Sequence, residues 1–180
     1  MRIVLATPFY PPDTEDPAPY VKELAQRLSS LHTITVVTYG SLPEKISGVT
    51  ILAVDKRQPI FFRLFSYALT LWRVARTADV VYAENGPSVE MPVGIAARVT
   101  RTPFMVHIGD ASAHSRATKE IIPRLLERFA TSAACAVISD MPLPKPEVLP
   151  FSPEPRAAQE AHRASWEEHL RLLNATFAHA

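Results

Sequence analysis

Several polar side chains of this sequence come directly after short apolar runs, where a ligand site is often found. Glu84 and Asn85 follow "VVYA", His107 lies near the end of "FMVHI", and Asp110 comes three residues later. Carboxylate, amide and imidazole groups can bind a small molecule through hydrogen bonds. A structural alternative stays open, in which Asn85 belongs to a turn with Gly86 and Asp110 only caps a helix.

A second group of polar residues lies between the first apolar run and the first helical pattern. It consists of Asp13, Glu15 and Asp16, within "YPPDTEDPAPYVKELAQRL". Asp16 is expected to be the N-cap of the helix, with Pro17 in the first helical position. Carboxylates at a helix N-terminus satisfy its free N–H groups and repel phosphate. We therefore expect a loop that caps its own helix and binds phosphate poorly.

The elements that position these residues follow from the apolar pattern. Six β-rich runs alternate with helical patterns, except that a short link joins the second and third runs. The sequence therefore predicts a doubly wound, Rossmann-like α/β fold with a mostly parallel sheet, whose strand order is 3-2-1-4-5-6. Ligands bind such sheets at the carboxyl ends of the strands, here between the first and fourth strands, in a crevice lined by 8–16 and 84–88. The predicted strands are 2–7, 33–38, 49–54, 79–84, 104–108 and 134–139, and the predicted helices are 17–31, 60–76, 87–100, 114–131 and 156–178.

The length of 180 residues suits one domain, which we place at 1–140. Residues 141–155 contain six prolines and predict a stiff, extended strap. The C-terminal helix, 156–180, carries an apolar stripe and is expected to pack back on the domain, the alternative being another protein. Its stripe consists of Trp166, Leu170, Leu173 and Phe177.

Composition and motifs exclude several classes of function. The net charge of +1 gives no electrostatic case for nucleic acid. No glycine-rich phosphate loop, zinc spacing or Ser-His-Asp order occurs, so we expect no cofactor and no metal, and His162 and His169 are expected to be solvated. The single cysteine, Cys135, lies in an apolar run and is expected to be a buried core thiol. The N-terminus has no signal-peptide pattern, which favours a cytoplasmic location.

The run 56–78 has five basic residues and no acidic one. Its apolar side chains cover more of the helix than packing on a sheet requires. The excess indicates a second apolar partner, for which the C-terminal helix is the first interpretation. A subunit interface and a membrane surface, contacted through 56–76, are the alternatives.

Three longer stretches can be compared with known proteins: "MRIVLATPFYPPDTEDPAPYVKELAQRL", "ADVVYAENGPSVEMPVGIAARVTRTPFMVHIGD" and "RLLERFATSAACAVISD". Together, over about residues 1–140, they resemble the N-terminal half of the family 4 glycosyltransferases, which have the two-domain GT-B fold. In that family the N-terminal half binds the acceptor and the C-terminal half binds the nucleotide sugar. The resemblance implies acceptor-binding residues, namely Asp13, Glu15, Asp16, Glu84 and Asn85.

The chain departs from the family pattern in two places. Glu15 and Asp16 stand where relatives commonly have two glycines. Many relatives also have a His-Asp pair after the fifth strand, but here a glycine precedes Asp110 and the histidine, His107, lies two residues earlier. The resemblance implies that His107 and Asp110 are catalytic, with His107 as a displaced acid/base group. A hydrogen-bonded histidine at a strand end is the alternative.

No counterpart of the family's nucleotide-sugar half is found in this sequence, although "SWEEHLRLL" resembles the last helix of full-length members. The expectation is a truncated, acceptor-side half of a GT-B enzyme that takes part in hexosyl transfer only with a separate donor-binding chain. The alternative is a non-catalytic protein, derived from such a domain and used for binding or homo-oligomerisation.

Overall fold

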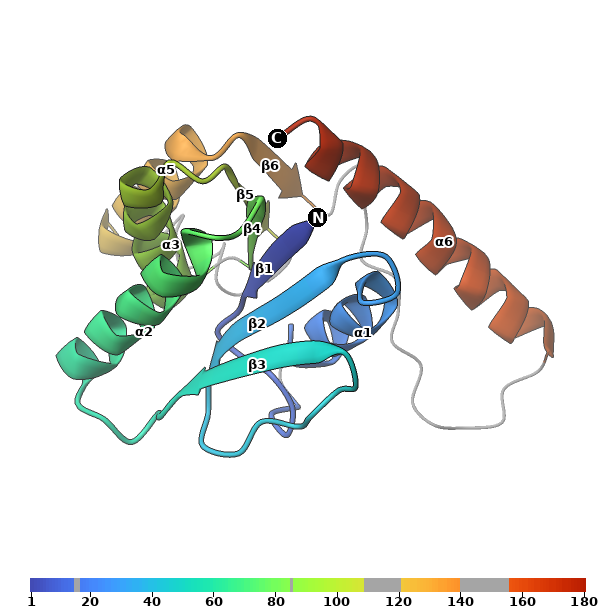
Figure 1. Cartoon of the computed structure of the whole chain (residues 1–180), viewed down its shortest axis with the longest axis horizontal. Coiled ribbons are helices and arrows are strands. Elements are labelled where there is room, and N and C mark those ends of the chain that lie inside the picture. Colours follow the sequence, from blue (N-terminus) through green and yellow to red (C-terminus); the bar gives the residue numbers. More distant parts are fainter. Residues whose placement is uncertain (15–16, 85, 109–120, 140–155) are drawn as a thin grey trace.

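The computed structural model describes residues 1–14, 17–84, 86–108, 121–139 and 156–180. They form a six-stranded sheet between two layers of helices (Figure 1). All strand pairs are parallel and the strand order is β3-β2-β1-β4-β5-β6, which confirms the predicted topology. The strands are β1 (Arg2–Ala6), β2 (Thr33–Tyr39), β3 (Val49–Val54), β4 (Val80–Glu84), β5 (Phe104–Ile108) and β6 (Ala136–Ser139).

The apolar runs explain the sheet. The central strands β1, β4 and β5 are almost wholly buried, because helices cover both of their faces. The edge strand β3 is half exposed, so its apolar run does not indicate full burial. The helices are α1 (Ala18–Leu28), α2 (Ile60–Ala75), α3 (Pro87–Thr100), α5 (Ile121–Ala133) and α6 (Arg156–Ala178).

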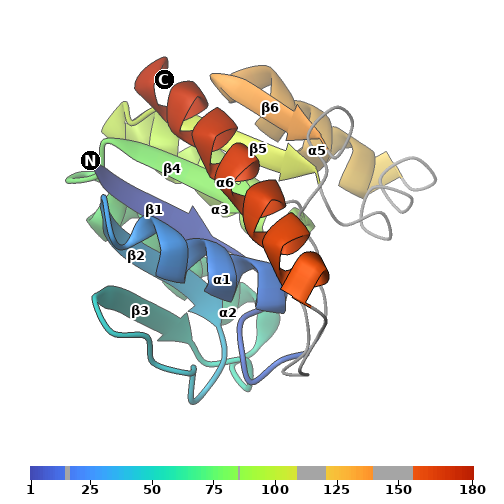
Figure 2. The same ribbon diagram turned by 90° about the vertical axis from the view of Figure 1, so that its right-hand side faces the viewer.

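The two helical layers bury separate sets of side chains. Helices α2, α3 and α5 lie on one face of the sheet, while α1 and α6 lie on the other (Figures 1 and 2). On the α1 face, α6 contributes the buried side chains of Trp166, Leu173 and Phe177. On the α2 face, Tyr67 and Leu71 pack with residues of α3. The first interpretation of the surplus apolar side chains of α2 is therefore wrong, because α6 covers the opposite face of the sheet.

Helix α1 begins at Ala18, one residue later than predicted, with Pro17 as the residue before it. The predicted cap, Asp16, lies outside the described residues. Val21, Leu24 and Leu28 are buried along one side of the helix, as its apolar spacing indicates.

Two expectations about single residues are wrong. Cys135 is exposed, because it lies just before the edge strand β6; its Sγ donates to the carbonyl of Phe104 at 3.1 Å, and partial burial raises the pKa of the thiol. His169 is buried rather than solvated, because it faces the sheet one turn after Trp166. In the described part of the chain no group of three potential ligands could hold a metal ion.

Candidate functional site

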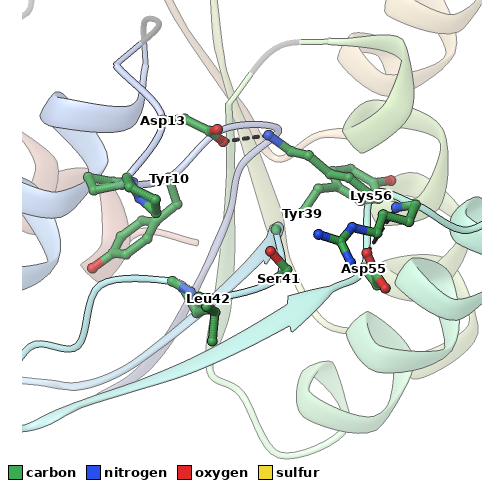
Figure 3. Close-up of a pocket in the computed structure, with 12 residues that line it drawn as sticks. Tyr10, Asp13, Tyr39, Ser41, Leu42, Asp55 and Lys56 are labelled. Atoms are coloured by element: carbon green, nitrogen blue, oxygen red, sulfur yellow. Dashed lines mark hydrogen bonds and ion pairs between the residues drawn. The ribbon is translucent and has the colours of Figure 1, made fainter.

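A cavity of about 290 Å³ lies at the carboxyl edge of the sheet, on the side of β1, β2 and β3 (Figure 3). Three loops form it, because parallel strands all end at the same edge. Hydrogen bonds tie the loops together: the Glu44 amide donates to the Pro11 carbonyl and the Gly40 amide donates to the Val54 carbonyl, both at 2.9 Å. The lining residues are 10–13 after β1, 39–43 at the end of β2, and 55–57 after β3.

A second cavity of about 230 Å³ adjoins the first and shares Tyr39 and Lys56 with it. Pro8 and Phe9 line it from the end of β1, and Ser88 lines it from the start of α3. These three residues come from the two segments that were expected to line a crevice between β1 and β4. The cleft therefore extends from the predicted crevice toward β2 and β3.

An ion pair spans this cleft. Nζ of Lys56 donates to the Asp13 carboxylate at 2.5 Å, so it joins the loop after β3 to the loop after β1 (Figure 3). Both side chains are about one-third exposed, at 37% and 31%, and solvent therefore weakens their attraction. The ammonium group also lies 5.2 Å from the centre of the Phe9 ring, within the range of a cation–π contact. The pair holds the two loops together and stays accessible to a ligand.

Aromatic rings form the apolar part of the cleft. Tyr39 stacks on Tyr67 with 4.2 Å between ring centres, and its hydroxyl donates to the Ser88 carbonyl at 2.7 Å. The guanidinium carbon of Arg63 lies 5.6 Å from the centre of the Tyr39 ring. Burial raises the pKa of Tyr39 well above its usual value, and burial together with Glu44 raises the pKa of Tyr10 to about 12. These phenols stay neutral near pH 7, so they contribute apolar surface and neutral hydroxyls rather than acid–base chemistry.

The larger cavity combines these rings with balanced charge. Two acidic and two basic side chains line it: Asp13, Asp55, Lys56 and Arg57. Ligand sites commonly have this character, with apolar walls and a few placed polar groups. The cleft can therefore bind a neutral, hydrogen-bonding molecule.

Glu84 and His107 lie elsewhere, beneath the helices. They are register partners on β4 and β5, so their side chains project from the same face of the sheet. Nδ1 of His107 lies 3.1 Å from Oε1 of Glu84, and both side chains are buried. The centres of the Tyr20 and Tyr82 rings lie 5.6 and 5.7 Å from that of the histidine ring. This is the geometry of a buried histidine–carboxylate pair, and a role of His107 in acid–base chemistry stays a prediction.

A polar network beside the buried pair connects the sheet to α1 and α6. The hydroxyl of Tyr20, on α1, lies 3.1 Å from the hydroxyl of Tyr82 on β4. The same Tyr20 hydroxyl lies 2.7 Å from Nε2 of His169 on α6. Hydrogen bonds between buried polar groups fix the relative position of the elements that carry them. The network therefore positions α6 on the α1 face.

The predicted site residues thus fall into three groups. Asp13 lines the cleft, while Glu84 and His107 are buried beneath α1 and α6. The other four, Glu15, Asp16, Asn85 and Asp110, lie outside the described residues. Tyr10 belongs to the segment 8–16 that was expected to line the crevice, whereas Tyr39, Lys56 and Arg63 were not predicted as cleft residues. A usable signal was present, because Tyr39 ends β2 and Lys56 follows β3 by two residues.

Comparison with known proteins places the fold. No protein-family model and no curated protein matches this sequence. Among solved structures, HepE of Anabaena in complex with UDP is similar with a TM-score of 0.52 and 17% identity, over 76% of this chain and 37% of HepE. A putative UDP-N-acetylglucosamine 2-epimerase of Listeria monocytogenes has a TM-score of 0.52 and 14% identity, over 76% and 38%. The UDP-GlcNAc 2-epimerase of Methanocaldococcus jannaschii has the same score and 8% identity, over 77% and 39%.

These neighbours have GT-B-type folds, and the chain spans little more than a third of each of them. At such low identity the similarity establishes a Rossmann-like α/β fold for this chain and nothing about activity.

Proposed function

We propose that this chain is the acceptor-side half of a family 4-like GT-B glycosyltransferase and takes part in glycosyl transfer only together with a separate donor-binding partner. The observation that carries this proposal is the cleft at the carboxyl edge of β1, β2 and β3. Its neutral phenols and balanced charges suit a hydroxyl-rich acceptor, which needs ring surface and hydrogen-bonding groups. The GT-B-type fold supports the same assignment.

The charge of the cleft argues against a nucleotide diphosphate as its ligand. Lys56 already has a carboxylate partner in Asp13, and the Asp55 carboxylate accepts a hydrogen bond from the backbone amide of Arg57. A diphosphate would have to compete with Asp13 for Lys56, and the negative charge of Asp55 at the same cavity would repel it. We therefore expect the isolated chain to bind UDP-sugars no more tightly than about 1 mM, or about −4 kcal/mol.

A titration followed by NMR tests the proposal. The ¹⁵N-labelled chain is mixed separately with N-acetylglucosamine, chitobiose, UDP and UDP-N-acetylglucosamine. We expect saturable shifts of the amides of 39–42 and 55–57 with at least one of the two sugars, and no saturation with the two nucleotides. Lys56→Met should abolish the sugar response, whereas Arg171→Gln, on the exposed side of α6, should keep it. Submillimolar binding of UDP-N-acetylglucosamine at these amides would overturn the assignment to the acceptor side.

Dependence on a partner needs a second experiment. Transfer from a radiolabelled UDP-sugar to chitobiose is measured in three samples. They contain the chain alone, a separately expressed GT-B donor half alone, and a mixture of the two. Activity of the chain alone would contradict the proposed dependence on a partner. Activity only in the mixture would support it.

A non-catalytic role in binding or oligomerisation is the second candidate. The exposed phenylalanines at the start of α2 favour it, because such side chains commonly mark an interaction surface. Saturable binding of a sugar without transfer under any of these conditions would favour this role.

A further inference from the structure

The start of α2 exposes four large apolar side chains in six residues. Ile60, Phe61, Phe62 and Phe65 are exposed by 56%, 83%, 67% and 68%. Phe61 and Phe65 are one helical turn apart and therefore lie on the same side of α2. Scattered single apolar side chains are normal on a protein surface, but a contiguous cluster marks a contact.

The rest of α2 shows why this cluster has no cover within the described part of the chain. The helix buries Tyr67, Leu71 and Ala75, which are spaced four residues apart and face the sheet and α3. The phenylalanines project from other sides of the helix. Helix α6, the other candidate for covering them, lies across the sheet (Figure 2).

The charge around the cluster is positive. Arg73 and Arg76 follow Phe62 and Phe65 by eleven residues, which is three turns, so they extend the same outer side of the helix. Both arginines are exposed, and the Arg76 guanidinium carbon lies 5.1 Å from the centre of the Trp72 ring. The outer side of α2 is therefore an aromatic strip continued by a basic one.

The whole layer shares this bias. The helices α2, α3 and α5, counted with the C-cap residues Arg76 and Arg101, carry seven arginines and two glutamates. One of the two, Glu90, is buried and accepts a hydrogen bond from the Gly86 amide, so it does not offset the surface charge. The opposite layer, α1 with α6, is nearly balanced, with five basic and four acidic residues. Of the two helical layers, the one formed by α2, α3 and α5 thus carries the basic excess.

We propose that the outer face of α2 binds a membrane surface that contains anionic lipids. Helices with aromatic residues beside arginines bind this way: the rings enter the boundary between headgroups and acyl chains, and the cations attract the lipid charge. A symmetric contact with a second copy would gather the basic excess of both copies at one interface, which is unfavourable. None of the described helices has the length and apolar content to cross a bilayer, so this contact is peripheral.

The proposed membrane-binding surface begins close to the cleft. Arg57 lines the larger cavity and Arg63 the smaller one, and both belong to the segment that begins α2. The cleft therefore lies next to the N-terminal end of α2. The membrane contact itself does not depend on what the cleft binds.

Vesicle co-sedimentation with the full chain tests the proposal. Vesicles are made of phosphatidylcholine alone or of equal parts phosphatidylcholine and phosphatidylglycerol. We expect partition into the anionic vesicles, lowered by added salt. Arg73→Gln with Arg76→Gln should lower the partition coefficient about fivefold for each arginine. Phe61→Ser with Phe65→Ser should lower it about tenfold or more.

Matched controls separate the surface from general effects. Arg163→Gln with Arg171→Gln removes two exposed arginines from α6. Leu31→Ser removes an apolar side chain that is 71% exposed in the turn after α1. We expect neither control to change partition more than twofold, and circular dichroism should show every variant folded. Equal partition into both kinds of vesicle, or equal losses in α2 and α6 variants, would overturn the proposal. So would a dimer that the Phe61→Ser, Phe65→Ser variant converts to a monomer without any change in partition.

Discussion

Replacing Trp166 with alanine measures how strongly α6 is held on the sheet. Its side chain is fully buried and stacks on Tyr20 with 5.8 Å between ring centres. The Arg27 guanidinium carbon lies 4.8 Å from the centre of the indole ring. Burial of about 200 Å² of aromatic surface is worth about 5 kcal/mol at 25 cal/mol per Å². Substitutions of this kind destabilise proteins by about 3–5 kcal/mol.

One feature of the indole lowers this expectation. Its Nε1–H is buried and finds no acceptor among the described residues. A buried, unsatisfied donor costs about 1–3 kcal/mol, and alanine removes that cost together with the ring. We therefore expect Trp166→Ala to lower the free energy of unfolding by about 3 kcal/mol, the low end of the range. Trp166→Phe removes the donor but keeps a ring, so its loss should stay below about 1.5 kcal/mol.

Urea unfolding followed by far-UV circular dichroism is the suitable assay, because it does not depend on the tryptophan that is removed. The midpoint should fall while the slope of the transition stays unchanged. Leu42→Ala is the control, since that side chain is 82% exposed and its removal should cost less than about 0.5 kcal/mol. A loss below about 1 kcal/mol for Trp166→Ala, or equal losses for the alanine and phenylalanine variants, would refute this account of α6.

Two other predictions concern buried polar groups. Glu84→Ala should lower the free energy of unfolding in urea by about 1–3 kcal/mol, because it removes the buried acceptor of His107. Glu84→Gln keeps an acceptor and should lower it by less. Equal losses would contradict the role of the hydrogen bond. Alkaline pH should unfold the protein: burial raises the pKa of Tyr10, Tyr39 and Tyr67 in the folded state, so above about pH 10 the unfolded chain binds fewer protons and stability falls. Tyrosine ionisation read at the phenolate absorbance should coincide with the loss of the circular dichroism signal; ionisation of all tyrosines near pH 10 without unfolding would disprove this.

The strands could be predicted closely because their signal is local. Apolar runs such as "VVYAE" fix both the position of a strand and its burial in the middle of a parallel sheet. The same reasoning fails at the edge, where Cys135 lies in an equally apolar run but is exposed. Its exposure depends on which strand has a neighbour on each side, and residue type does not carry that information.

The partner of a helix was harder to predict than the helix itself. The spacing of Trp166, Leu173 and Phe177 shows that α6 buries one side, but not which face of the sheet receives it. His169 lies on that same side, one turn after Trp166, so its burial was within reach of the pattern. The cleft was hard to predict for the same reason, because it depends on contacts between distant parts of the chain. Lys56 and Asp13 are 43 residues apart and meet only because β1 and β3 end at one edge with β2 between them.

The hydrogen bond between Tyr20 and His169 also sets an order of events during synthesis. The two residues are 149 positions apart in the chain. At about 5–20 residues per second, a ribosome needs roughly 7–30 s between them. Until His169 has been made, the ring of Tyr20, and that of Tyr82 once it has been synthesised, lack the cover that α6 later provides. The nascent chain therefore presents an aromatic face to chaperones before it can close, and variants that weaken α6 should prolong that exposure.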